Sequence, residues 1–193
     1  DGGQPIERLD ALFMELRAQL AAFSDSTVKW IPQHRNSEAD ALARELNGAR
    51  PKSASVVQGD LLAYNALKGL IDHAASEFGR LDGLVNNAGG QYISPLASTS
   101  AKGWQAVIDT NLTGGFLVAR ECFNQSMQQH GGAVVNIVAD MWGSMPGMGH
   151  SGAARAGMVS FTETAALEWA AQGVRVNAVA PGYIASSGMD HYP

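Results

Sequence analysis

The 193-residue sequence has a single cysteine, Cys122, so no disulfide can form within the chain and disulfide-rich secreted folds are excluded. It has no apolar run of about eighteen residues, and its first residues lack the basic-then-apolar pattern of a secretory signal. Basic residues are also few, because 13 Lys and Arg stand against 18 Asp and Glu for a net charge of −5. This balance disfavours nucleic acid and anionic membranes as partners. We therefore expect a cytoplasmic protein.

The residues that are present favour an α/β fold. The hydrophobic fraction is 46% and there are 22 glycines, which is typical of one domain, here residues 1–193, with many tight turns. Strand-like apolar stretches alternate with amphipathic stretches of helical period along the whole chain. We expect Asn47–Gly48 to end the second helix in a left-handed turn. The expected strands are 27–31, 56–58, 81–85, 133–138 and 174–180, and the expected helices are 6–23, 39–46, 65–78, 100–130 and 152–171.

Such alternation predicts a doubly wound, Rossmann-like parallel sheet with helices on both faces. Ligands bind such sheets beyond the carboxyl ends of the strands. The last two expected strands lead into the loops Asp140–Ser151 and Pro181–Ser187. We therefore expect the chemistry to lie between these two loops.

Three motifs together carry a family resemblance. They are Asn86-Asn87-Ala88-Gly89 after a strand, Asn111 within the next long helix, and the segment Arg175–Gly182. In this order and spacing, the sequence resembles the short-chain dehydrogenase/reductase family. From Leu84 to Ser187 it is similar to the branch that contains peroxisomal trans-2-enoyl-CoA reductase and bacterial acyclic-terpene alcohol dehydrogenases. Residues 34–61 instead resemble bacterial pteridine reductases.

The resemblance implies a dinucleotide-binding domain whose first and last strands are missing from this sequence. A basic residue after the second strand accepts the extra phosphate of NADP(H), and Arg35, with His34 beside it, occupies that place. We therefore expect NADP(H), with NAD as the alternative; a solvated basic turn is the other interpretation of this pair. Asp60 is expected at the adenine, or as the cap of the next helix. The full set of expected cofactor contacts is His34, Arg35, Asp60, Leu61, Asn86, Ala88, Gly89, Pro181, Gly182 and Ile184.

The catalytic loop departs from the family's usual Ser and Tyr-x-x-x-Lys pattern. The match places Ser151 at the tyrosine and Arg155 at the lysine, and Asn111 is retained on the preceding helix. Arginine keeps the positive charge but cannot shuttle a proton, and a serine hydroxyl is a far weaker acid than a phenol. A Tyr-Lys type of carbonyl chemistry is therefore excluded. The expected catalytic residues are Asn111, His150, Ser151 and Arg155, although His150 without a chemical role and Ser151 as a helix N-cap are open alternatives.

Reduction of an activated C=C bond requires less of the protein, because the enolate oxygen needs only hydrogen-bond donors. The leading prediction is therefore an NADP(H)-dependent oxidoreductase that reduces an enoyl thioester such as an acyl-CoA. Two alternatives are a dehydrogenase of an apolar or terpenoid alcohol, and a catalytically inert, binding-only homologue. Helices that are apolar on more than one face, at 112–127 and 154–171, predict a homo-oligomer. No metal is expected, and the candidate substrate contacts, for which packing or turn roles are the alternative, are Tyr92, Asp140, Trp142 and Met148.

Overall fold

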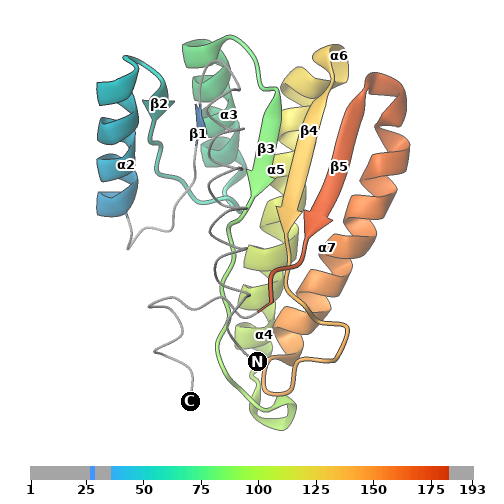
Figure 1. Ribbon diagram of the computed structural model, residues 1–193. Helices are drawn as coiled ribbons and strands as arrows, with labels where there is room; N and C mark the ends of the chain where they lie inside the picture. The colour runs from blue at the N-terminus through green and yellow to red at the C-terminus, as the bar shows by residue number, and fades with distance from the viewer. Residues whose placement is uncertain (1–26, 29–35, 183–193) are drawn as a thin grey trace, which may run out of the picture.

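The computed structural model describes residues 27–28 and 36–182 and contains two parallel sheets (Figure 1). Strands β1 (Thr27–Val28) and β2 (Ala54–Ser55) form one pair. Strands β3 (Gly83–Asn86), β4 (Gly132–Ile137) and β5 (Val174–Val179) form the other sheet, in that order. The expected parallel α/β arrangement is thus confirmed. The helix expected over 6–23 and residues 29–31 of the first expected strand lie outside the described residues.

The three-stranded sheet places the ends of its strands together. Gly83 pairs with Ala133 and Gly132 pairs with Val174, so the strands run side by side with their arrowheads at the same edge (Figure 1). The segments that follow them are 87–90 after β3, 138–148 after β4 and 180–182 after β5. We call this edge the carboxyl edge.

The helical segments largely follow the expected ranges. A continuous helical run from Ala101 to His130 begins at Ser100, whose Oγ accepts a hydrogen bond from the Gly103 N–H at 3.0 Å. In the described part of the chain no helix combines the length and apolarity needed to cross a bilayer. The elements are α2 (Asn36–Ala49), α3 (Tyr64–Phe78), η2 (Leu96–Ser98), α4 (Ala101–Ile108), the π-helical turn η3 (Asp109–Thr113), α5 (Gly114–Cys122), the π-helical turn η4 (Phe123–Met127), α6 (Gln128–His130), α7 (Gly149–Glu168) and η5 (Ala170–Gln172).

The predicted end of α2 is wrong. The helix continues through Asn47 and Gly48, and the left-handed residue is Lys52, with φ of 60°. The Asn47 side chain explains the difference, because its Oδ1 accepts from the backbone N–H groups of Ser53 at 2.8 Å and Ala54 at 3.0 Å. These contacts fold the following loop back on the helix without a left-handed turn at Gly48.

Two further boundaries differ from the sequence prediction. Strand β2 covers Ala54–Ser55 rather than 56–58, because these two residues are the ones that pair with β1. Helix α7 begins at Gly149, three residues earlier than expected. Ser151 is consequently the third residue of the helix, which rules out the N-cap interpretation of its hydroxyl.

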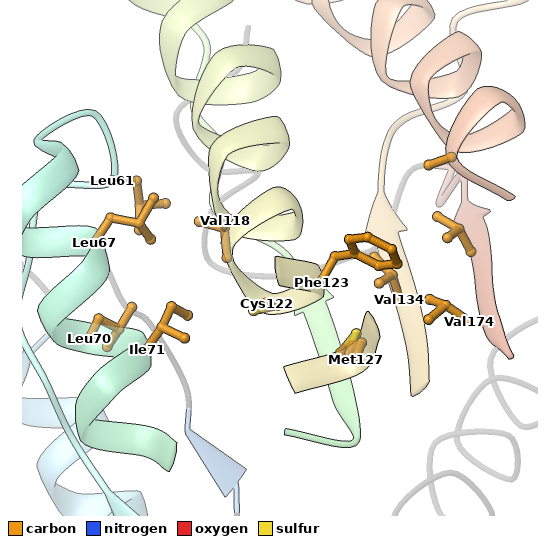
Figure 2. Close-up of a cluster of buried hydrophobic side chains, with 12 residues drawn as sticks. Leu61, Leu67, Leu70, Ile71, Val118, Cys122, Phe123, Met127, Val134 and Val174 are labelled. Carbon is orange, nitrogen blue, oxygen red and sulfur yellow. The ribbon is translucent and has the colours of Figure 1, made fainter. Parts of the chain in front are cut away.

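The core holds the helices against the sheet. Helices α5 and α7 contact each other, and they pack on β3 and β5 respectively, while α3 packs on α5. Leu67 and Ile71 of α3 face Val118 of α5, and Phe123 and Met127 reach toward the sheet (Figure 2). The Phe123 ring also stacks on Trp169 with centroids 4.4 Å apart. The carboxyl edge therefore projects from a packed framework.

Cys122 lies in this core, and the reactivity of its thiol tests whether the core is packed as described. The side chain is 2% exposed, and burial raises its pKa from 9.0 to about 12. We expect native protein at pH 8 to resist iodoacetamide and to be labelled only when urea unfolds it. Because the unfolded thiol ionises first, the stability contributed by this group is complete below pH 9 and is lost as the pH rises toward 12. Rapid labelling of the native protein in a mass-spectrometric time course would contradict this packing.

Candidate active site

Asn111 clamps the turn that follows β3. Its Nδ2 donates to the carbonyl oxygen of Gly90 at 2.6 Å and to that of Val107 at 2.8 Å, and its Oδ1 accepts from the Gly90 N–H at 3.1 Å. The residue is 2% exposed and lies in the π-helical turn η3, a local widening that is frequent at functional sites. The amide thus fixes the backbone of Gly90 at the carboxyl edge.

Arg155 reaches the same turn from α7. Its Nη1 donates to the carbonyl oxygen of Ile137 at the end of β4, at 2.7 Å. A Cβ built on Gly89 would lie 2.6 Å from Arg155 Nη2 and 2.6 Å from Asn111 Oδ1, so both side chains close on this glycine. Burial lowers the pKa of Arg155, but the guanidinium remains charged at neutral pH. Its Nε is buried with no hydrogen-bond partner within the described residues.

His150 and Ser151 are held by two consecutive residues of the loop after β3. The Ser151 Oγ donates to Gln91 Oε1 at 2.7 Å, and the Tyr92 ring meets the His150 ring edge-on with centroids 4.5 Å apart. His150 and Ser151 are 1% and 0% exposed. The His150 Nδ1 accepts from the Ser151 N–H at 2.8 Å, so the neutral ring carries its proton on Nε2. That Nε2 is buried without a hydrogen-bond partner among the residues described.

Gln91 is the site residue that sequence reasoning missed. It follows directly after the Asn86–Gly90 run and precedes Tyr92, an expected substrate contact. A glutamine in a loop carries no local signal, and its partner lies 60 positions away. The contact arises only when the loop after β3 and the start of α7 meet at the carboxyl edge.

Asn86, an expected cofactor contact, has its side chain engaged elsewhere. Its Nδ2 donates to Gly115 O at 3.1 Å and to Asn136 Oδ1 at 2.8 Å. Asn136 Nδ2 then donates to Thr162 Oγ1 at 2.8 Å, and that hydroxyl donates to Met158 O at 2.7 Å. We call Asn86, Asn136 and Thr162 the polar ladder, which joins α5, β3, β4 and α7. A cofactor contact at Asn86 is left to its backbone.

Several other expected cofactor contacts lie around the carboxyl edge or in the core. Asp60 Oδ1 accepts from the Leu62 N–H at 2.9 Å and so closes the turn before α3. The capping alternative is wrong, because the N-cap of α3 is Ala63 and no side chain caps it. The Leu61 side chain is part of the core. Ala88 packs against the same core. Gly182 follows Pro181 and is exposed. The remaining three, His34, Arg35 and Ile184, lie outside the described residues.

The expected substrate contacts lie on two loops that are tied together. The Ser94 N–H donates to the Gly147 carbonyl at 2.7 Å, and the Asp140 N–H donates to the Pro181 carbonyl at 3.3 Å. Trp142 is 67% exposed, whereas Met148 is half-buried and directly precedes α7. Of these residues, Tyr92 contacts the His150 ring, and the Met148 carbonyl accepts from the Gly152 N–H at 3.0 Å in the first turn of α7. The structure thus gathers Gly89, Asn111, His150, Ser151 and Arg155 at one edge, with the loop residues around them.

Comparisons with known proteins agree with this architecture. The family model described as short chain dehydrogenase matches residues 18–192. The chain is 39% identical over 176 residues to a 3-oxoacyl-[acyl-carrier-protein] reductase of Synechocystis, covering 88% of the chain and 70% of that protein. It is 35% identical over 156 residues to the peroxisomal 2,4-dienoyl-CoA reductase of Rattus norvegicus, covering 79% of the chain. It spans about half of that enzyme's length, 52%.

A solved structure is also similar. The citronellol catabolism dehydrogenase of Pseudomonas aeruginosa PAO1 superposes with a TM-score of 0.72 at 50% sequence identity. The match covers 86% of this chain and 67% of that one. The similarity confirms the Rossmann-like parallel fold.

Proposed function

The chain belongs to the short-chain dehydrogenase family and is an oxidoreductase, and from this premise we propose that it reduces an activated C=C bond of an enoyl thioester with NADPH. The observation that carries the proposal is the donor set at the carboxyl edge. Ser151 offers a hydroxyl, His150 an imidazole N–H and Arg155 a permanent cation, each buried or half-buried. Donors of this kind stabilise a developing enolate oxygen without a phenolic acid.

The described residues fit the nicotinamide end of such a cofactor. Arg155 carries a buried Nε without a partner within the described residues, and buried donors of this kind are normally satisfied by a bound polar group. The turn at Gly89–Gly90 has no side chains and stands at the carboxyl edge, where backbone can approach a ligand closely. The choice of NADPH over NADH rests on Arg35.

The residues of the chain have separate tasks in this chemistry. When bound, NADPH would supply a hydride to the β-carbon of the thioester, and the α-carbon of the resulting enolate would take up a proton from a side chain or water. Ser151 Oγ and His150 Nε2 donate to the enolate oxygen, and Arg155 lowers the energy of the negative charge. Asn111 holds the Gly90 turn in place for both reactants. Relatives whose names specify acyl-carrier-protein and CoA substrates support the thioester class.

Oxidation of an apolar alcohol is the second candidate. The 50% identity to the citronellol catabolism dehydrogenase favours it, and the exposed Trp142 on the loop after β4 suits an apolar chain. In this reaction an oxidised nicotinamide would accept the hydride, and the substrate hydroxyl would pass its proton toward Ser151 Oγ, because His150 already carries a proton on Nε2. The two candidates differ in the direction of the nicotinamide absorbance change, and one assay therefore separates them.

The test begins with cofactor binding. We expect NADPH to bind the purified chain with micromolar affinity, measured by nicotinamide fluorescence at fixed salt, and Arg35→Asp to lose that binding. Arg44→Asp makes the same charge change at an exposed position of α2 and should bind as the wild type does. Steady-state assays with enoyl thioesters and with terpenoid alcohols then follow. Absence of binding of NADPH and NADH at millimolar levels would overturn the proposal in favour of an inert homologue.

A further inference from the structure

We propose that Gln91 is a positioning residue that directs the hydroxyl proton of Ser151, an inference that rests on the function proposed above. Its Oε1 accepts the Ser151 hydroxyl at 2.7 Å. Ser151 is 0% exposed, so water does not compete for that hydroxyl. The pair joins the loop after β3 to the first turn of α7, at the centre of the donor set.

The direction of this proton decides what Ser151 can do. A serine hydroxyl has one proton, and in the structure that proton points at Gln91. It cannot be donated to a substrate oxygen at the same time. For Ser151 to stabilise an enolate, Gln91 must stop accepting the hydrogen bond from the Ser151 hydroxyl. The Ser151 oxygen must still keep a hydrogen-bond partner.

A side-chain amide can do this by rotating about its terminal bond. The rotation exchanges Oε1 and Nε2 with almost no change in shape. Nε2 then donates to Ser151 Oγ, and the Ser151 proton is directed to the substrate. A hydroxyl that accepts one hydrogen bond is a better donor of the next, because the bonds polarise each other. Glutamine allows both states, whereas a carboxylate of the same shape can only accept.

The hydrogen bonds that the neighbouring ionisable groups make within the described residues go to atoms other than the Ser151 hydroxyl. His150 Nδ1 binds the backbone N–H of Ser151, and the Tyr92 ring packs on His150. Arg155, one helical turn after Ser151, donates through Nη1 to Ile137 O. The contact to the hydroxyl itself comes from Gln91.

Gln91→Glu tests the proposal through its pH profile. We expect kcat for the enoyl thioester to fall on the order of 100-fold at pH 8, with KM changed little, because the carboxylate traps the Ser151 proton. A protonated carboxyl can donate, and the pKa of a glutamic acid side chain in peptides is about 4.3. The ratio of variant to wild-type kcat should therefore rise as the pH is lowered toward 5.

Controls separate positioning from structure. In a Ser151→Ala background, Gln91→Glu should add at most a few-fold further loss, since its target is gone. Gln91→Met keeps the length of the side chain but removes its hydrogen bonds. It should lower kcat about tenfold with no change in the shape of the pH profile. This variant replaces Gln91→Glu in the test if thermal unfolding shows that Gln91→Glu is not folded. For either variant, a loss of equal size with and without Ser151 would overturn the proposal, as would a kcat ratio for Gln91→Glu that does not change with pH. A wild-type chain that binds NADPH but reduces no enoyl thioester would instead overturn the proposed function.

Discussion

Replacing Gly89 by alanine is expected to weaken NADPH binding on the order of 100-fold and to destabilise the fold by about 2 kcal/mol. The new Cβ would lie 2.6 Å from Arg155 Nη2 and 2.6 Å from Asn111 Oδ1, closer than carbon approaches such atoms. Neither neighbour can retreat freely, because Asn111 is held by three hydrogen bonds and Arg155 by its bond to Ile137 O. The strain therefore falls on the turn that the cofactor is proposed to approach.

The matched control is Gly69→Ala in α3. This glycine is exposed, and an added Cβ would meet no atom within 4 Å. Alanine there should stabilise the helix by about 0.5–1 kcal/mol and leave NADPH binding unchanged. Nicotinamide fluorescence and thermal unfolding measure both effects. A Gly89→Ala protein with the Tm and NADPH affinity of the wild type would show that Arg155 and Asn111 do not close on this turn.

Asn111→Asp is expected to destabilise the protein by about 3 kcal/mol at pH 7 and to abolish turnover. The substitution keeps the shape of the side chain but replaces Nδ2, the donor to two carbonyl oxygens, with an acceptor. A buried carboxylate would then face both oxygens without a proton to offer. Because only the protonated form can donate, the loss of stability should be smaller at acid pH than at neutral pH.

Urea denaturation at several pH values measures this effect. Asn47→Asp is a suitable control, because Asn47 Oδ1 already accepts two backbone bonds and only its bond from Nδ2 to Ala54 O at 2.9 Å would be lost. We expect that variant to lose about 1 kcal/mol or less. Equal losses for the two variants would mean that Asn111 is not the clamp on Gly90.

The elements with strong periodic patterns could be predicted from the sequence. Apolar runs located β3, β4 and β5 to within about two residues, and Ser100 marked the start of the long helical run. Parallel strands put their carboxyl ends at one edge, so the meeting of the loops near Gly89 and Ser151 also followed from the order of the elements.

What could not be predicted depends on side chains that meet across long stretches of chain. Gln91 and Ser151 are joined over 60 positions, and Asn86 and Asn136 over 50. A local pattern contains neither partner of such a pair. The end of α2 failed for a related reason, because Asn47 binds backbone six and seven residues later instead of adopting the turn that its type favours.

The polar ladder also limits how the chain can misfold. Asn86 and Asn136 are directly opposite each other in the pairing of β3 with β4. A slip of one residue would turn the side chain of Asn86 to the other face of the sheet and leave the fully buried Asn136 without its donor. The ladder thus favours this alignment of β3 with β4 during folding. The same alignment places Gly89, three residues after Asn86, next to Arg155.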